Sequence, residues 1–377
     1  MHGLRHALAK RLPWALPMLE KLELLDSEGN WPVPFEYMYK YSEKRLLPQV
    51  RFPNEESGEG SDNEEEDEER GEEDDLPQLL TIFAVAPKLH SVIINSYDLW
   101  DDERIERLRV RLPWSQLKQL GKFYVSTSDF LWLMTQCPSL IRCSELTIKC
   151  IDQGTMNTGS VRFPLQSLDI QFQDEDDDTD VRMVMINFLQ SFDFPHLREL
   201  RVEITRDWTS RLHSCFIAFL SNVMSLLRLV IRMQVATMRL KDLTSILCAV
   251  PSLVELEICQ DVYCVDECIE PMLNRELLNE FMLPRPRSTT PFLPKLHTLS
   301  LVGEMTFGSD DLADMLRMRM AGDSHTPLTL QRVYLYFVGV LRADFEFDLI
   351  TDIFGNRVHM SFEHRVPTNF CAFVDPL

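Results

Sequence analysis

The sequence predicts an α/β solenoid in which a short strand and a helix alternate along the chain. Three observations support this prediction: leucines recur with a spacing of three and then two residues, prolines stand just before many of them, and helix-like segments lie between them. The pattern is clear in residues 293–303, LPKLHTLSLVG. There, the spacing of Leu296, Leu299 and Leu301 fits neither a long helix nor a simple alternating strand.

The leucine pattern recurs along most of the chain. Its copies begin at Leu19, Leu89, Leu117, Leu140, Leu165, Leu197, Leu226, Leu253, Leu296 and Leu330. Two copies are irregular, since one has Lys122 in its third apolar slot and another has an extra residue before Leu146. We expect the last two apolar residues of each copy to point inward from a strand and the first to close the preceding turn. A strand and a helix cannot bury their apolar sides alone, so stacked units supply the core.

The segments between the copies have the apolar spacing of amphipathic helices, and several begin with Ser or Asp, as helix starts prefer. We expect helices at 128–137 (with Ser128 as N-cap), 180–192, 210–224, 241–250, 266–281 and 309–320. The parallel strands would line the concave wall of an irregular horseshoe, with the helices on the convex side. The prediction is a single domain over 1–377 of about ten irregular repeats, interrupted by a disordered acidic insertion at 54–75.

The negative charge of the chain is concentrated in that insertion. The formal net charge is −21, and residues 55–75 hold 14 acidic residues and one Arg, which leaves the rest of the chain mildly acidic. Such a balance repels a phosphate backbone, so nucleic acid is not an expected partner. Ser61 with the acids that follow it resembles a site for an acid-directed kinase.

The sequence indicates a soluble protein of the cytoplasm or the nucleus. No run of 18 apolar residues is present, which argues against a membrane span. The N-terminus lacks an uninterrupted apolar run and a small-residue cleavage site, so we do not expect a signal peptide. The nine cysteines are scattered and fit reduced thiols.

The Leu-x-x-Leu-x-Leu pattern resembles leucine-rich repeat proteins across nearly the whole chain. More narrowly, residues 76–94, 112–120 and 130–143 resemble the leucine-rich repeat regions of F-box-type proteins of mushroom-forming fungi. This resemblance implies a receptor that presents targets to a cullin-RING ubiquitin ligase. The F-box itself is not found: residues 76–83 are two residues short of its opening and lack its Glu. A ligase adaptor is therefore an expected partner only if an F-box lies upstream.

No motif for catalysis, a cofactor or a metal stands out. The sequence has no G-x-S-x-G, H-E-x-x-H or phosphate loop, so we expect no enzyme activity and no cofactor. Cys259, Cys264 and Cys268 lack a fourth zinc ligand nearby and fit buried small side chains better. The acidic run at 174–180 lacks the Gly and Glu of a calcium loop and fits a solvated loop before a helix.

The concave wall is the predicted binding site for a protein partner. Arg and Tyr, which dominate the energetics of interfaces, stand at its outward positions. The candidate partner-binding residues are Arg198, Glu199, Arg201, Arg228, Arg232, Glu255, Glu257, His297, Arg332, Tyr334 and Tyr336.

Two functional hypotheses follow from the sequence. The first is a non-catalytic recognition scaffold, similar to the target-binding part of an F-box receptor. The second comes from a looser resemblance to acidic leucine-rich nuclear proteins, which implies binding of histones or other basic proteins through residues 55–75.

Overall fold

The computed structural model describes residues 18–25, 36–38, 86–95, 112–149, 161–173, 181–205, 208–233, 238–260, 271–282, 292–321, 330–338 and 345–363. The chain divides into two compact units, Met1–Leu120 and Gly121–Leu377, and each is described by itself. The acidic insertion predicted at 54–75 lies outside the described residues, and a single domain over 1–377 stays a prediction.

The first unit contains short strands that carry the earliest copies of the leucine pattern. They are β1 (Lys21–Leu25), β2 (Glu36–Met38), β3 (Ser91–Asn95) and β4 (Gln119–Gly121), the last of which ends at the boundary. Strand β1 pairs antiparallel with β2 and parallel with β3. Leu22 and Val92, opposite each other in the parallel pair, are both buried.

The second unit is built on a long parallel sheet whose strands follow one another in chain order. These strands are β6 (Arg142–Lys149), β8 (Ser167–Gln173), β10 (Glu199–Ile204), β11 (Arg228–Met233), β12 (Glu255–Gln260), β13 (Thr298–Gly303), β14 (Arg332–Val338) and β15 (Val358–Glu363). Every neighbouring pair among them is parallel. The short strand β5 (Tyr124–Ser126) pairs with β6, and β7 (Val161–Arg162) pairs with β9 (Phe192–Asp193).

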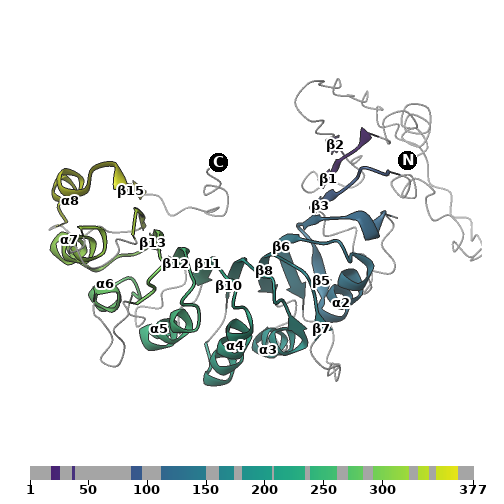
Figure 1. The fold of residues 1–377 in the computed structure, drawn as a ribbon, viewed down its shortest axis with the longest axis horizontal. Helices are drawn as coiled ribbons and strands as arrows, with labels where there is room; N and C mark the ends of the chain where they lie inside the picture. The colour runs from purple at the N-terminus through teal and green to yellow at the C-terminus, as the bar shows by residue number, and fades with distance from the viewer. Residues whose placement is uncertain are drawn as a thin grey trace, which may run out of the picture. The chain divides into compact units, whose positions relative to one another are not determined.

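A helix follows most strands of the second unit. The helices are α2 (Thr127–Gln136), α3 (Val181–Ser191), α4 (Ser210–Asn222), α5 (Leu240–Cys248), α6 (Arg275–Met282), α7 (Ser309–Leu316) and α8 (Phe347–Phe354). Within this unit they lie on one side of the sheet, and none of the described helices lies on its other side (Figure 1). This arrangement confirms the predicted leucine-rich repeat solenoid. In the described part of the chain, no helix is both long and apolar enough to cross a bilayer.

The alternation of burial along the strands confirms the predicted inward positions. Leu296, Leu299 and Leu301 are fully buried, whereas His297 is exposed and Ser300 is half-buried. Strands β8, β10 and β14 show the same alternation, whereas in β11 and β12 the outward residues Val230 and Glu257 are buried as well. Across the strands the inward residues form continuous apolar rows, because residues two apart in a strand face the same side. Stacked repeats therefore share one core.

Two serines tie the turns of successive repeats together. The Ser225 hydroxyl lies 2.8 Å from the carbonyl oxygen of Leu197, to which it donates a hydrogen bond, and the Ser252 hydroxyl donates in the same way to Leu226 over 2.9 Å. Both serines stand just before the first leucine of their copy. Each hydrogen bond reaches back by one repeat, so it satisfies a turn carbonyl that has no partner in a strand ladder.

The backbone conformation explains why two copies of the leucine pattern are irregular. At Lys122 the chain adopts a positive φ of 59°, and Phe123 takes the buried place that a third leucine would fill. At Glu145, with φ of 52°, the pairing of β6 with β8 shifts register between Cys143 and Leu146. The extra residue of this copy is thus a β-bulge, which absorbs the insertion without breaking the sheet.

Several predicted helix boundaries were wrong by a few residues. Helix α2 begins after Ser126, not Ser128, because the Ser126 hydroxyl accepts a 3.0 Å hydrogen bond from the backbone N–H of Asp129. Helix α4 is capped by Thr209 in the same way and ends at Asn222. The helix predicted at 266–281 is described only as Arg275–Met282, and 309–320 ends as helix α7 at Leu316, followed by a π-helical turn.

Candidate functional site

The side of the second unit's sheet on which no described helix lies is the candidate site, and we call it the open face. It consists of the outward positions of strands β8 and β10–β15, and it corresponds to the predicted concave wall. The strand register sorts these positions into three rows that cross the sheet. The first row holds Ser167, Glu199, Arg228, Glu255, Thr298 and Arg332. The second row holds Asp169, Arg201, Val230, Glu257, Ser300, Tyr334 and His359. The third row holds Gln171, Glu203, Arg232, Cys259, Val302, Tyr336 and Ser361.

The centre of the open face, on β8–β12, is an ion-paired layer. Arg201 Nη1 lies 3.0 Å from Asp169 Oδ2 on the neighbouring strand. Arg228 Nε lies 3.6 Å from Glu255 Oε2, and its Nη2 lies 3.9 Å from Glu257 Oε2. The pairs join adjacent strands because opposite charges occupy register-matched or diagonal positions, where side chains come within reach of each other.

Much of the polar capacity of this centre is used inside the protein. Glu257 is only 6% exposed and accepts a hydrogen bond from the Cys259 thiol, with 3.4 Å between Sγ and Oε1. Glu199 accepts a 3.0 Å hydrogen bond from the Ser167 hydroxyl. Burial also raises the pKa of the Asp169 carboxyl above its ordinary value, although the positive charges of Arg201 and Arg232 oppose that shift. A partner that bound here would compete with contacts already made.

The last strands of the open face present aromatic side chains instead. The rings of Tyr334 on β14 and His359 on β15 are stacked, with centroids 5.0 Å apart and planes inclined by 13°. Tyr336 stands two residues further along β14 and is half-buried, and Arg332 at the start of β14 is exposed. This aromatic end, defined as Arg332, Tyr334, Tyr336 and His359, combines the residue types that contribute most to protein interfaces.

The structure distributes the predicted partner-binding residues over two surfaces. Most lie in strands of the open face: Glu199, Arg201, Arg228, Arg232, Glu255, Glu257, Arg332, Tyr334 and Tyr336. Arg198 and His297 lie elsewhere, in the turns just before β10 and β13, because the strands begin one residue later than the leucine spacing suggests. Both are exposed. Of the residues on the open face, Glu257 is placed for internal pairing rather than for contact with a partner.

Sequence reasoning missed Asp169 and His359. Asp169 occupies the same slot of its repeat as Arg201, and their strands are adjacent, so a comparison of equivalent repeat positions would have found the pair. His359 lies on β15, which carries no leucine pattern. The alternation of Val358, Met360 and Phe362 with polar residues is the signal that marks this segment as a strand.

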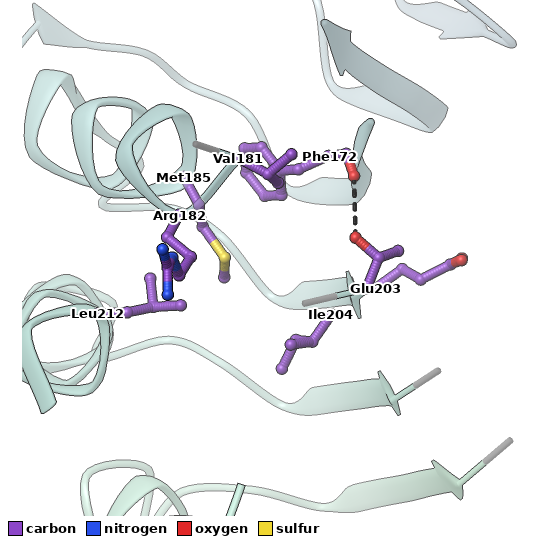
Figure 2. Close-up of a pocket in the computed structure, with 8 residues that line it drawn as sticks. Phe172, Val181, Arg182, Met185, Glu203, Ile204 and Leu212 are labelled. Carbon is purple, nitrogen blue, oxygen red and sulfur yellow. Dashed lines mark hydrogen bonds between the residues drawn. The ribbon is translucent and has the colours of Figure 1, made fainter. Parts of the chain in front are cut away.

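A small hollow opens where the strands β8 and β10 end (Figure 2). It encloses only about 10 Å³ and is partly open to solvent, and it is lined by Phe172, Val181, Arg182, Met185, Glu203, Ile204, Thr205 and Leu212. The Thr205 hydroxyl donates a 3.3 Å hydrogen bond to the carbonyl oxygen of Phe172 across it. The lining is mostly apolar and the space is below that of a small-molecule site.

The described residues contain no group of three His, Cys, Asp or Glu side chains that could hold a metal ion. Of the three cysteines weighed as zinc ligands, Cys259 lies on β12, and Cys264 and Cys268 lie outside the described residues. Burial raises the pKa of the Cys259 thiol, and the nearby carboxylate of Glu257 raises it further. A protonated thiol is a poor metal ligand and a poor nucleophile.

Comparison with known proteins adds little beyond the fold. No family model matches the chain, and no curated protein is significantly similar to it. One similar solved structure is the leucine-rich repeat-containing protein LegL7 from Legionella pneumophila, with 10% sequence identity and a TM-score of 0.34. The match covers 68% of this chain and 77% of that chain. A likeness at this level supports no functional argument.

Proposed function

We propose that the chain is a non-catalytic protein-recognition scaffold that binds a protein partner on its open face. The observation that carries this proposal is the aromatic end, where Tyr334, Tyr336 and the exposed His359 stand together on two adjacent strands beside the exposed Arg332. Aromatic side chains on a rigid sheet lose little conformational entropy on binding, so they anchor a partner efficiently.

The ion-paired centre has a different part in this proposal. Its carboxylates and guanidinium groups already pair across strands, so a partner gains little net energy by replacing one pair with another. The centre makes binding of an uncharged partner less favourable, because such a partner would bury the ion pairs without forming new polar contacts to them. Affinity therefore comes mainly from the aromatic end, and selectivity comes from the centre.

The particular role we propose is that of a substrate receptor for a cullin-RING ubiquitin ligase, acting in the cytoplasm or the nucleus. Its support is the resemblance of residues 76–94, 112–120 and 130–143 to the repeat regions of F-box-type proteins. A ligase adaptor is part of this proposal only if an F-box is present upstream.

A second candidate function is the binding of histones or other basic proteins through residues 55–75. The 14 acidic residues of that segment favour it, since they concentrate negative charge in a short stretch. This segment lies outside the described residues, so the proposal rests on composition alone.

Quantitative affinity capture from an extract of the native organism tests both candidates. We expect the double variant Tyr334→Ala/Tyr336→Ala to capture at least about tenfold less of each protein that the wild type captures specifically. The half-buried Ser300, on the same face, provides the control variant Ser300→Ala, which should leave capture unchanged. Recovery of a ligase adaptor or cullin would support the ligase role, and their absence would remove that role only.

A deletion of 55–75 in the same experiment separates the candidates. Loss of captured histones on deletion, with the aromatic variants unaffected, would favour the second function. If neither the aromatic variants nor the deletion changes the captured proteins, both functions are wrong.

A further inference from the structure

A second surface borders the open face along the amino ends of the strands, and we call it the strand-entry edge; the two surfaces share Arg332. It comprises the turns that precede β8 and β10–β14, together with the first residues of β6 and β14. Because neighbouring strands are parallel, their amino ends meet at the same edge of the sheet. A row of turn residues links them, each accepting backbone N–H groups from the next repeat: Ile141, Gln166, Arg198, Leu227, Val254 and His297.

Exposed basic side chains occupy both flanks of this edge. Beside β6 and β10 these are Arg142, His196 and Arg198, and beside β13 and β14 they are Lys295, His297 and Arg332. All six are exposed. Among the residues that the structure describes, none of the six forms an ion pair. Four of the six, Arg142, Arg198, Lys295 and Arg332, carry a positive charge at neutral pH, so in a chain of formal net charge −21 this edge is a local patch of positive charge.

The acidic residues nearest to this edge do not neutralise it. Glu199, the first residue of β10, accepts a hydrogen bond from Ser167, and Glu255, the first residue of β12, pairs with Arg228. Both belong to the ion-paired centre of the open face. The charge that remains available at the edge is therefore positive.

Apolar side chains stand between the two basic flanks. Met224 is 85% exposed and Leu227 is 42% exposed, and both lie in the turn before β11. In the next turn Pro251 is exposed and Val254 is half-buried. A methionine this exposed has no role in the core, and flexible apolar side chains of this kind are typical of surfaces that bind other proteins.

We infer that the strand-entry edge binds an acidic segment of another polypeptide, in which a few apolar residues lie between two groups of Asp or Glu. The apolar residues would contact Met224 and Leu227, and the acidic groups would contact the basic flanks. This inference concerns a surface other than the open face and goes beyond the proposed function.

The spacing of the strands sets the length of this segment. Neighbouring strands lie about 4.8 Å apart, so the three steps from Arg198 beside β10 to His297 beside β13 span about 14 Å. An extended segment rises by about 3.3 Å per residue, so the two acidic groups are about four residue steps apart, with roughly three residues between them. The whole contact, from Arg142 to Arg332, takes a segment of about nine residues.

The apolar centre favours a polypeptide over a nucleic acid. A phosphate backbone carries charge at every step and offers nothing apolar to the turn of Met224 and Leu227. The overall negative charge of the chain also opposes a long polyanion, because repulsion from the rest of the protein grows with its length.

The test uses the full chain and a fluorescent peptide of about nine residues, with three leucines flanked on each side by three glutamates. Fluorescence anisotropy at low salt should give a dissociation constant on the order of 10–100 μM. A peptide of the same composition, with all the leucines at one end, should bind at least about fivefold more weakly, because it cannot place acid on both flanks. A single-stranded oligonucleotide of equal charge serves as the competing probe.

Charge reversal on the edge supplies the decisive variants. The double variant Arg198→Glu/Lys295→Glu changes one exposed residue on each flank and should weaken peptide binding at least about tenfold. The matched control is Arg211→Glu/Lys241→Glu, which makes the same change of charge at exposed positions of α4 and α5 and should have less than a twofold effect. Met224→Ser should weaken binding several-fold without changing the melting temperature, since its side chain is exposed.

Three results would overturn the inference: no binding of the peptide at the highest concentration reached, equal loss in the edge and control variants, or equal binding of the two peptides. Tighter binding of the oligonucleotide through Arg198 and Lys295 would overturn it as well and would assign the edge to phosphate. The variant Tyr334→Ala/Tyr336→Ala should bind the peptide as the wild type does, so failure of this inference and failure of the proposed function give different results.

Discussion

The centre and the aromatic end of the open face share one core and differ in what covers it. Beneath both, inward leucines such as Leu229 and Leu299 are fully buried. Above them, the centre carries ion pairs between strands, whereas the end carries the stacked rings of Tyr334 and His359. The repeat fixes the inward positions because they form the common core, and it leaves the outward positions to vary. Differences in function along the open face must therefore be sought in the outward rows.

The largest expected effect is the same in both regions. Leu229→Ala in the centre and Leu299→Ala near the end should each lower the free energy of unfolding by about 2–5 kcal/mol, because each leaves a cavity in the shared core. Thermal and urea unfolding measure this loss.

The half-buried outward residue Ser300 gives the control, and Ser300→Ala should be nearly neutral. Equal losses for Leu299→Ala and Ser300→Ala would mean that the strand register is wrong. A large loss at Leu229 with none at Leu299 would mean that the end does not share the core of the centre.

Much of this shared core could be predicted from the sequence, for a physical reason. The spacing of Leu296, Leu299 and Leu301 reports which side chains must be buried, and burial dominates the energetics of folding. The position of a helix start depends on one hydrogen bond, such as that of Ser126, and two serines near each other offer nearly equal caps. The leucine pattern therefore located the strands that carry it, and it could not separate Ser126 from Ser128.

The candidate site was less predictable because it depends on contacts between repeats. Glu257 occupies an outward slot by sequence, yet it is buried and already paired with Arg228 and Cys259. Conversely, Arg198 precedes its strand and therefore lies on the strand-entry edge. The residue types were visible in the sequence, but the partner on the next strand decides which of them remain available.

The second prediction compares the stability that equivalent turn residues contribute in the centre and near the aromatic end. Ser252→Ala in the centre should cost about 1 kcal/mol, because the carbonyl oxygen of Leu226 loses its hydrogen bond. The equivalent turn position near the end is Lys295, which is exposed, and Lys295→Ala should have almost no effect. Urea unfolding of the two variants makes the measurement. If both variants lose the same stability, the serine hydrogen bonds do not distinguish the centre.

The third prediction concerns the pH dependence of the ion-paired centre. Burial raises the folded-state pKa of Asp169 above the ordinary 3.8, against the opposing charges of Arg201 and Arg232. Its carboxyl therefore binds a proton more readily in the folded state than in the unfolded state. The stability that this proton contributes is fully present below pH 3.8 and is lost as pH rises through the higher folded-state pKa.

Asp169→Asn removes that titration, so the wild type should gain stability relative to the variant as pH falls from neutrality towards 3.8. Urea unfolding across this range measures the difference between them. The opposite trend, with the wild type losing stability relative to Asp169→Asn on acidification, would show that Arg201 dominates over burial. His297→Asn changes an exposed turn residue on the strand-entry edge and leaves the Asp169 titration in place.

The smallest effect is expected at the aromatic end itself. His359→Ala removes the ring stacked on Tyr334 at 5.0 Å, and a stacked pair of this kind contributes about 0.5–1.5 kcal/mol when both rings are buried. His359 is exposed, so the loss should be at the bottom of that range, about 0.5 kcal/mol or less. A double-mutant cycle with Tyr334→Ala isolates the pair from the burial of each ring. A coupling well above that value would mean that the stack is a structural element of the last repeat, comparable to the ion pairs of the centre. A coupling near zero, together with loss of captured protein, would mean that the two rings serve to bind a partner and not to stabilise the fold.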